Sequence, residues 1–286
     1  MNNPRFSIII PAHNEEKFIG STLQSLVDQT LLPEQIVVVN DNSNDATYEI
    51  INTFEKKHGF IKQITVKSST KHEPGSKVIK AFQKGFLSLH PDYDIICKFD
   101  ADLIFPQDYL EKLAIHYAEN PKIGMAAGFC YIKKENQWQL ENLTNKDHIR
   151  GALKSYRKEC FEQIDGLVPE MGWDTIDEIK ASYHGWEIKT DPSLKVKHLK
   201  PTGAHYQKKS NQQQGIAFYR MRYGLMLTLI ASLKLAFRKN KPSLILQYLR
   251  GYFSAKSKKS SFLITASQGR FLRKSRWKGI IEKIFR

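Results

Sequence analysis

Residues 6–11 read Phe-Ser-Ile-Ile-Ile-Pro, and residues 36–40 read Ile-Val-Val-Val-Asn. Both are short β-branched runs of the kind that form strands buried on both faces of a parallel sheet. Apolar residues recur at helical spacing after each run, so each expected strand leads into an expected helix. Strand and helix therefore alternate from the start of the chain, which is typical of α/β proteins.

The alternation of strands and helices continues beyond residue 60. Strands are expected at 63–66 and 94–99, and helices from about Lys77 to Leu89 and from Pro106, because proline suits the first position of a helix. We therefore predict an α/β fold in which helices sandwich a mostly parallel sheet. Ligands bind such sheets at the carboxyl ends of the strands, so the residues after each strand are the first candidates for chemistry.

Polar residues follow three of the expected strands. They are Pro11-Ala-His-Asn-Glu-Glu16, Asn40-Asp-Asn-Ser-Asn-Asp45 and Asp100-Ala-Asp102. No Gly-x-Gly-x-x-Gly and no Walker motif follows any of these strands, which disfavours dinucleotide oxidoreductases and P-loop kinases. Phosphates bound here would therefore need a metal ion to neutralise them.

The last of these segments, Asp100-Ala-Asp102, is suited to a hard cation. Its two carboxylates lie two residues apart at the end of a strand, and both can turn toward one Mg²⁺ or Mn²⁺ that shares its other positions with phosphates and water. An isolated Asp-x-Asp is more often a solvated turn. The position at the end of a buried strand favours the metal site.

The order and spacing of these motifs resemble glycosyltransferase family 2 enzymes of the GT-A fold, which is Rossmann-like. The residues that carry the resemblance are Ser7 to Glu16, Val39 to Thr47, Asp100-Ala-Asp102, Gly172-Trp-Asp-Thr-Ile-Asp-Glu178 and Gly185-Trp186. The resemblance implies transfer of a sugar, with inversion, from a nucleotide-diphosphate sugar to an acceptor hydroxyl. A UDP-sugar is the expected donor, and Mg²⁺ or Mn²⁺ the expected cofactor.

The resemblance also implies which residues bind the nucleobase. Pro11, Ala12, His13 and Glu15 would line the base pocket, and the His13 ring would stand where the family often has an aromatic ring against the base. Asp41 would accept a hydrogen bond from the base imide, since a carboxylate is an acceptor and the imide N–H a donor.

The resemblance implies that the Asp100-Ala-Asp102 motif binds the ribose and the diphosphate. Asp100 would face the ribose, Asp102 would face the metal and the diphosphate, and the small Ala101 would leave room between them. Lys77 follows Pro-Gly-Ser at an expected helix start, where backbone donors and a cation can meet phosphate. A solvated surface lysine is an equally good interpretation of Lys77.

Inverting transfer needs a general base that takes the proton of the acceptor hydroxyl. In the family this base is the aspartate of a Glu-Asp pair that precedes a Gly-aromatic pair. Counting back from Gly185-Trp186 places Asp174 in that position, with Trp173 where the glutamate normally stands. Asp177 and Glu178 remain alternatives, and acids at these positions also suit the start of a helix expected over 176–183.

The family often adds a histidine downstream of the base as a further metal ligand. His198 and His205 are both available, and neutral imidazole can join carboxylates on manganese. We prefer His198 because it ends a strand-like run, although a single histidine is more often structural.

The formal charge of +15 is distributed unevenly along the chain. Residues 1–190 carry 22 basic and 27 acidic side chains, whereas residues 191–286 carry 22 basic and only 2 acidic ones. This division suggests chemistry in the first part and an anionic surface as the partner of the second. We expect a catalytic domain over 1–216 and a basic, amphipathic helical region over 217–286.

The basic region is expected to lie on a membrane rather than cross it. The uncharged stretch 223–233 is shorter than the ~18 to 20 residues that a spanning helix needs. Residues 244–253 and 271–285 mix aromatic and aliphatic side chains with Lys and Arg, as helices in an anionic interface do. A helical cap with a solvated basic face is the alternative.

The expected location is the cytoplasmic face of the membrane, with a lipid-linked or polysaccharide acceptor in cell-surface glycan assembly. Cys97, Cys130 and Cys160 show no metal or disulfide spacing, and the N-terminus shows no export signal. Both features suit a peripheral protein in a reducing compartment.

Two other classes of protein share parts of this pattern. A nucleic-acid binding protein would explain the basic region, but no nucleic-acid motif accompanies it, so we expect no nucleic-acid partner. A nucleotidyltransferase would also use paired carboxylates and a metal, but it would want a glycine- and arginine-rich phosphate loop near the N-terminus. The segment Pro11 to Glu16 is not such a loop.

Overall fold

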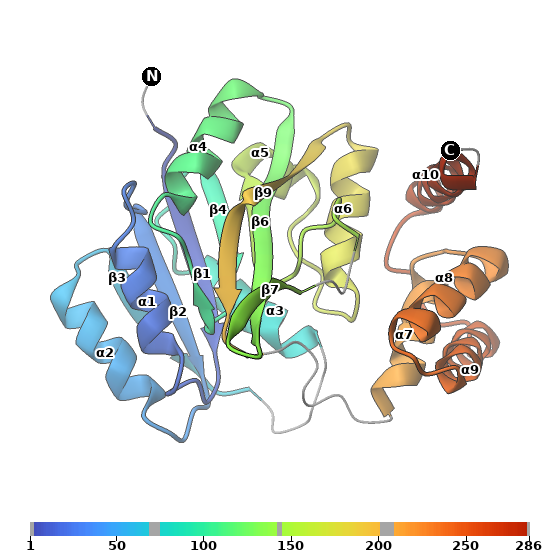
Figure 1. Ribbon diagram of the computed structural model, residues 1–286, viewed down its shortest axis with the longest axis horizontal. Helices are drawn as coiled ribbons and strands as arrows, with labels where there is room; N and C mark the ends of the chain where they lie inside the picture. Colours follow the sequence, from blue (N-terminus) through green and yellow to red (C-terminus); the bar gives the residue numbers. More distant parts are fainter. Residues whose placement is uncertain (1–2, 69–74, 142–144, 201–208, 285–286) are drawn as a thin grey trace.

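The computed structural model describes residues 3–68, 75–141, 145–200 and 209–284 (Figure 1). Nine strands in these ranges form one sheet in the order β3-β2-β1-β4-β8-β6-β9-β5, and β7 pairs with β6. The strands are β1 (Phe6–Ala12), β2 (Gln35–Asp41), β3 (Ile61–Val66), β4 (Ile95–Phe99), β5 (Leu103–Ile104), β6 (Ile123–Lys134), β7 (Gln137–Leu140), β8 (Leu153–Arg157) and β9 (Glu187–His198).

Helices cover the sheet, and among the described residues four more helices follow the last strand in the chain (Figure 1). Those connected to the sheet are α1 (Ile19–Val27), α2 (Thr47–Lys57), α3 (Ser76–Phe86), α4 (Tyr109–Glu119), α5 (Lys158–Gln163) and α6 (Trp173–Tyr183). The C-terminal helices are α7 (Lys209–Arg220), α8 (Leu225–Arg238), α9 (Ser243–Ser257) and α10 (Ala266–Ile284).

Two helices begin at residues other than those expected from the sequence. The helix expected from Pro106 begins at Tyr109, because the Pro106 carbonyl accepts the Tyr109 N–H in a turn that precedes the helix. The helix expected from residue 176 begins at Trp173, directly after Gly172, whose φ of +85° allows the sharp turn into it. Asp174 is therefore inside the first turn of α6 rather than before the helix.

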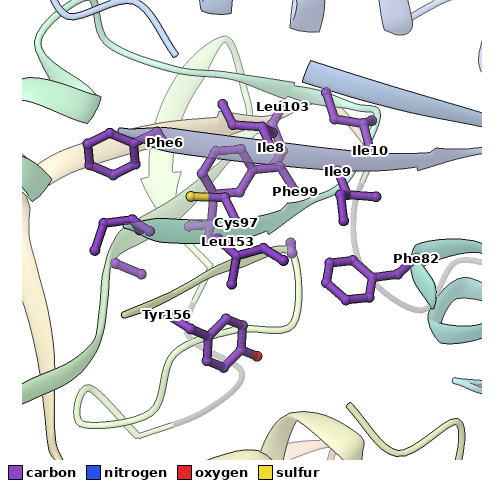
Figure 2. Packing of buried hydrophobic residues seen from close by; sticks show 14 of the residues in the cluster. Phe6, Ile8, Ile9, Ile10, Phe82, Cys97, Phe99, Leu103, Leu153 and Tyr156 are labelled. Atoms are coloured by element: carbon purple, nitrogen blue, oxygen red, sulfur yellow. The ribbon is translucent and has the colours of Figure 1, made fainter. Parts of the chain in front are cut away.

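The first half of the sheet is parallel, as its β-branched runs predict. β3, β2, β1 and β4 pair in this order, and Ile8, Ile9 and Ile10 of β1 are fully buried. Figure 2 shows Ile8 and Ile10 on one face of β1 and Ile9 on the other, on the side of Phe82 of α3. Gly85 lets α3 approach closely, because a Cβ there would lie 2.6 Å from Ile9 Cγ2.

The second half of the sheet contains antiparallel pairs. β8 pairs antiparallel with both β4 and β6, β9 runs parallel to β6, and β5 pairs antiparallel with β9. The sheet as a whole is therefore mixed. The pairing of β5 with β9 is the one that matters for the site, because it brings the end of β9 to the turn after β4.

The C-terminal helices pack on one another and on α6 (Figure 1). Ile176 and Ile179 of α6 share an apolar cluster with Phe218 and Met221 of α7, so these helices are attached to the sheet domain through α6. The expected boundary at 216/217 falls within α7, and the division into two domains stays a prediction. In the ranges that the structure describes, every helix is too short or too polar to cross a bilayer.

Candidate active site

The carboxyl ends of β1 and β2 place the residues expected around the base side by side. Ala12 pairs with Asn40 in the parallel register, so the residues after both strands share one edge. His13 Nδ1 donates a hydrogen bond to the carbonyl oxygen of Asp41 at 2.5 Å. The Asp41 side chain is buried, and its Oδ1 accepts a hydrogen bond from the Ser68 amide at 3.0 Å. The structure thus brings His13 and Asp41 together.

Glu15 and Pro11 belong to the same edge. Pro11 pairs with Val39 of β2, and the Glu15 carboxylate accepts two hydrogen bonds from Lys200 Nζ at 2.6 and 2.7 Å. Burial raises the pKa of Glu15 above its ordinary value, although the Lys200 charge opposes this effect. Sequence reasoning missed Lys200, because this contact joins residues 185 positions apart.

The turn between β4 and β5 carries Asp100, Ala101 and Asp102. Thr22 of α1 fixes it, since its hydroxyl donates to the Ala101 carbonyl at 2.8 Å and accepts the Leu103 amide at 3.0 Å. Ala101 and Asp102 are buried, and only Asp100 is partly exposed. This turn therefore differs from a solvated surface loop.

His198 reaches this turn through the β5–β9 pairing. His198 lies opposite Leu103 in the register, and its Nε2 is 3.5 Å from Asp102 Oδ2. Its Nδ1 lies 3.0 Å from Glu141 Oε2. Burial alone would lower the pKa of His198, but the two carboxylates outweigh burial and raise the pKa to about 9. His205 lies outside the described residues.

The side chains of Asp100, Asp102 and His198 fit a metal ion. Each offers one ligand atom, and these atoms lie within 4.8 Å of one another. Carboxylate oxygens with one imidazole suit Mn²⁺, and carboxylates alone suit Mg²⁺. Glu141 on the second nitrogen of His198 is the usual arrangement for orienting a ligating imidazole.

Glu141 is a site residue that sequence reasoning missed. It is buried, and Arg150 Nη1 lies 2.5 Å from its Oε2. Glu141 also groups with Cys130 and His198, all three buried. No local motif marks it, since its neighbours in space come from β6, β9 and the approach to β8.

Lys98 connects the Asp-Ala-Asp turn to α6. This buried lysine forms an ion pair with Asp100 and donates a hydrogen bond to the Gly151 carbonyl at 3.0 Å. Its ammonium lies 5.4 Å from the centre of the Trp173 ring. Trp173 is itself only 7% exposed, so its ring is part of the core and is not an open surface on which a sugar ring could stack.

Asp174 lies next to Trp173 and keeps an accessible carboxylate. Gly151 lies against both residues, and the Asp174 side chain is 34% exposed. His148 Nε2 lies 3.6 Å from Asp174 Oδ2. Burial would raise the pKa of Asp174, but His148 outweighs it and holds the pKa below its ordinary value. Asp174 is therefore ionised at neutral pH, as a general base must be.

Asp177 and Glu178, the alternatives to Asp174, point into a buried network. Lys154 Nζ lies 3.1 Å from Asp177 and 3.0 Å from Glu178. Tyr156 donates a hydrogen bond to Asp177 at 2.5 Å, and His148 Nδ1 lies 2.8 Å from Glu178. Burial raises the pKa of Asp177, whereas Lys154 and His148 keep that of Glu178 low. These contacts give both carboxylates a structural role and favour Asp174 as the base.

Lys77 lies in the first turn of α3, as expected. Gly75 precedes this helix with a φ of +76°, and a Cβ on it would lie 3.1 Å from the Glu170 carbonyl. The N-terminus of α3 thus adjoins the loop before α6. This places Lys77 on the side of the molecule that carries Asp174.

His148 makes the stability of this region depend on pH. Burial lowers its pKa, but Asp174 and Glu178 outweigh burial and raise it to about 9. Histidine in an unfolded chain titrates near pH 6.5, so His148 stabilises the fold fully below about pH 6.5, and this contribution is lost as the pH rises through about 9. We expect the contribution of His148 to the unfolding free energy to fall by about 2 to 3 kcal/mol over this window.

Chemical denaturation near both ends of the window measures this effect. His148→Gln should flatten the decline, because Gln carries no charge to lose. His184→Gln is the matched control, since His184 is exposed in the turn after α6. Equal slopes for the wild type and His148→Gln would contradict the assignment.

Solved structures identify the fold of the chain. The chain aligns with mannosyltransferase PcManGT from Pyrobaculum calidifontis, in complex with GDP-Man and Mn²⁺, over 98% of this chain and 81% of that one (TM-score 0.57, 16% identity). It aligns with S. aureus TarS 1–349, in complex with UDP-GlcNAc, over 87% and 73% (TM-score 0.58, 20% identity). The fold is that of GT-A glycosyltransferases, as the sequence predicts.

The family follows from the sequence match. The model of glycosyl transferase family 2 matches residues 7–170, more than half of the chain, and the chain belongs to this family. Enzymes of this family transfer sugars. Nothing in these comparisons supports a nucleotidyltransferase or a nucleic-acid binding protein.

Curated relatives share shorter stretches with the chain. The probable glycosyltransferase YdaM of Bacillus subtilis (strain 168) is 38% identical over 116 residues, which is 40% of this chain and 25% of that protein. The dolichyl N-acetyl-alpha-D-glucosaminyl phosphate 3-beta-D-2,3-diacetamido-2,3-dideoxy-beta-D-glucuronosyltransferase of Methanococcus voltae is 32% identical over 136 residues, which is 46% of this chain and 40% of that protein. The chain thus matches less than half the length of either relative.

Proposed function

We propose that this enzyme transfers a sugar, with inversion and with the help of Mg²⁺ or Mn²⁺, from a nucleotide-diphosphate sugar to an acceptor hydroxyl. The observation that carries the proposal is one cluster of side chains. Asp100, Asp102 and His198 offer three ligand atoms at the end of β4, and Lys98 and Gly151 connect them to Asp174. These contacts support a cation site and a general base within one connected cluster.

The donor would bind along the carboxyl ends of β1, β2 and β4. Pro11, Ala12, His13, Glu15 and Asp41 would line the base pocket. In that pocket the hydrogen bond from His13 to the Asp41 backbone fixes the imidazole ring, and the bond from Ser68 fixes the Asp41 carboxylate. A fixed acceptor discriminates best between bases, because it cannot turn away from a wrong partner.

Diphosphate binding would involve Asp100, Ala101, Asp102 and Lys77. A divalent cation held by Asp102 and His198 would neutralise the departing diphosphate. Asp100 is already paired with Lys98, which fits a role toward the ribose. We favour a uridine nucleotide as the donor. TarS was solved with UDP-GlcNAc and PcManGT with GDP-Man, so uridine and guanosine nucleotides both occur on this fold.

Asp174 would act as the general base. Its carboxylate would accept the proton of the acceptor hydroxyl while that oxygen attacks the anomeric carbon on the face opposite the diphosphate. His148 would hold the carboxylate in place and keep it ionised at neutral pH. The helix dipole adds to this effect, since Asp174 lies in the first turn of α6.

The acceptor we propose is a lipid-linked sugar or a polysaccharide chain at the cytoplasmic face of a membrane. The name of the Methanococcus voltae relative describes a dolichyl phosphate-linked acceptor. The basic C-terminal helices, with 22 basic and 2 acidic side chains in residues 191–286, suit such a location.

Ligand-induced stabilisation tests the donor site directly. We expect UDP with Mn²⁺ to raise the melting temperature of the protein, since a ligand that binds only the folded state stabilises it. Asp102→Asn should weaken this Mn²⁺-dependent binding at least about 100-fold, because loss of a ligand costs more than the 10- to 100-fold typical of an outer-shell residue. Glycosyl transfer should fall in parallel.

Asp165→Asn is the matched control for this experiment. Asp165 is exposed, has a φ of +62° that Asn tolerates well, and lies after α5. The control should bind UDP and Mn²⁺ like the wild type. Mn²⁺-dependent UDP binding that survives Asp102→Asn unchanged would refute the proposed donor site.

A further inference from the structure

The helix α8 exposes large apolar side chains on its outer side. Its buried side chains are Leu227, Thr228, Ser232 and Ala236, whereas its exposed ones include Met226, Leu233 and Phe237. These three apolar side chains are 61%, 48% and 88% exposed. A helix on the surface of a water-soluble protein normally buries its large apolar residues and exposes its polar ones.

The exposed apolar residues form one face. Met226, Leu233 and Phe237 are seven and four positions apart, which places them in one line along a helix of 3.6 residues per turn. We call them the outward face of α8. Leu229 and Ile230, both partly exposed, flank this line.

The inner side of α8 is already packed, since Leu227 is buried in the cluster that contains Phe218 and Met221 of α7. The hydroxyl of Thr228 donates to the Gly224 carbonyl, and that of Ser232 donates to the Thr228 carbonyl, both at 2.7 Å. The polar groups are thus satisfied within the helix, and the small Ala236 packs in a cluster with Leu244 and Tyr248 of α9. The outward face is therefore not an accident of a poorly packed helix, because the inner side is already satisfied.

We propose that the outward face of α8 inserts into the headgroup region of an anionic lipid bilayer. Basic residues at the C-terminal end of the helix, Lys234, Arg238, Lys239 and Lys241, are exposed beside this face. Apolar side chains next to cations are what an interfacial helix presents to anionic lipid. A second copy of the chain is a poor occupant, because the C-terminal region would meet an equal excess of positive charge.

The C-terminal half of α8 contacts the segment that leads to His148. Lys234 Nζ and Arg238 Nη2 both donate hydrogen bonds to Asn145 Oδ1, at 2.9 and 3.2 Å. Asn145 lies between Glu141, which orients His198, and His148, which contacts Asp174. A bilayer under α8 would thus hold a lipid-linked acceptor near Asp174, an extension that rests on the proposed function.

Vesicle flotation of the full chain tests the proposal. The vesicles are phosphatidylcholine alone or phosphatidylcholine mixed with phosphatidylglycerol. We expect the wild type to float with the anionic vesicles. The double variant Leu233→Ser/Phe237→Ser should bind them at least about tenfold more weakly, because it lacks two apolar side chains that the bilayer would bury. Added salt should weaken the wild-type binding through the basic residues.

Leu87→Ser is the matched control. Leu87 is 79% exposed after α3 in the sheet domain, and its loss should leave vesicle binding unchanged. The proposal would be overturned if the wild type did not bind anionic vesicles. It would also be overturned if the double variant bound them as well as the wild type does. Concentration-dependent dimers in sedimentation velocity that disappear in the double variant would assign the outward face to a second copy instead.

The test does not depend on catalysis. UDP-induced stabilisation of the same variants shows whether they are folded and whether the donor site works. Flotation without UDP binding would contradict only the proposed function. UDP binding without flotation would contradict only the membrane proposal.

Discussion

Asp174→Asn should lower kcat for glycosyl transfer by about 10²- to 10⁴-fold, the usual contribution of a positioned general base. Asn keeps the size of the side chain but cannot take up the acceptor proton at neutral pH. The Asp174 carboxylate contacts His148 and is 34% exposed, so the exchange leaves no buried charge without a partner. The fold and the affinity for UDP with Mn²⁺ should therefore stay close to those of the wild type.

Single-turnover kinetics with a saturating nucleotide sugar measure the chemical step apart from donor binding. Asp165→Asn, at an exposed position after α5, should transfer sugar at the wild-type rate. If Asp174→Asn retains the wild-type kcat, another residue takes the proton and the proposed mechanism fails.

Asp177→Asn distinguishes a catalytic role from a structural role for the acidic residues of α6. Asp177 is almost fully buried against Lys154 and Tyr156, so its loss should act on stability before it acts on the chemical step. A large loss of kcat in a folded Asp177→Asn protein would move the role of base from Asp174 to Asp177.

The parts of this protein that could be predicted from sequence are those that depend on local pattern. The runs at β1 and β2 contain enough β-branched residues to specify buried strands, and parallel strands end at one edge. This is why Asp41 and Asp102 could be singled out before the fold was known. His198 was a candidate through the family resemblance and was preferred over His205 because it ends a strand-like run, and β9 does end there.

The parts that could not be predicted depend on contacts between distant segments. Glu141, Lys154 and Lys200 carry no motif, and each acquires its partner only when β8 or β9 joins the sheet. The antiparallel position of β8 between β4 and β6 is itself such a contact. The numbers of basic and acidic side chains likewise indicated the basic region. They could not indicate the outward face of α8, because they do not say which side of a helix is buried.

Lys154 shows what these distant contacts do for stability. It is fully buried on β8, and its ammonium contacts the carboxylates of Asp177 and Glu178 and the carbonyl oxygen of Asp174. Lys154→Met keeps a side chain of similar length but removes the cation. Breaking a buried ion pair on one side costs about 3 to 5 kcal/mol, a large part of the 5 to 15 kcal/mol that holds a typical domain folded.

The loss in Lys154→Met should depend on pH. Burial already raises the pKa of Asp177, and without Lys154 this pKa should rise further above its unfolded value. The pKa of Glu178, which Lys154 and His148 now hold below its ordinary value, should rise as well. Carboxylates with raised pKa values stabilise the fold at low pH, where they are protonated, and this contribution is lost as the pH rises through the folded pKa. The deficit relative to the wild type should therefore be larger at pH 8 than at pH 5.

Urea denaturation at both pH values measures this deficit. Lys154→Met/Asp177→Asn should recover part of the stability at pH 8, because one buried charge is gone and Asn can still accept the hydrogen bond from Tyr156. Lys56→Met, on the exposed side of α2, should change the unfolding free energy by no more than about 0.5 kcal/mol at either pH. A Lys154→Met protein with the same small, pH-independent change would mean that Lys154 does not compensate these carboxylates.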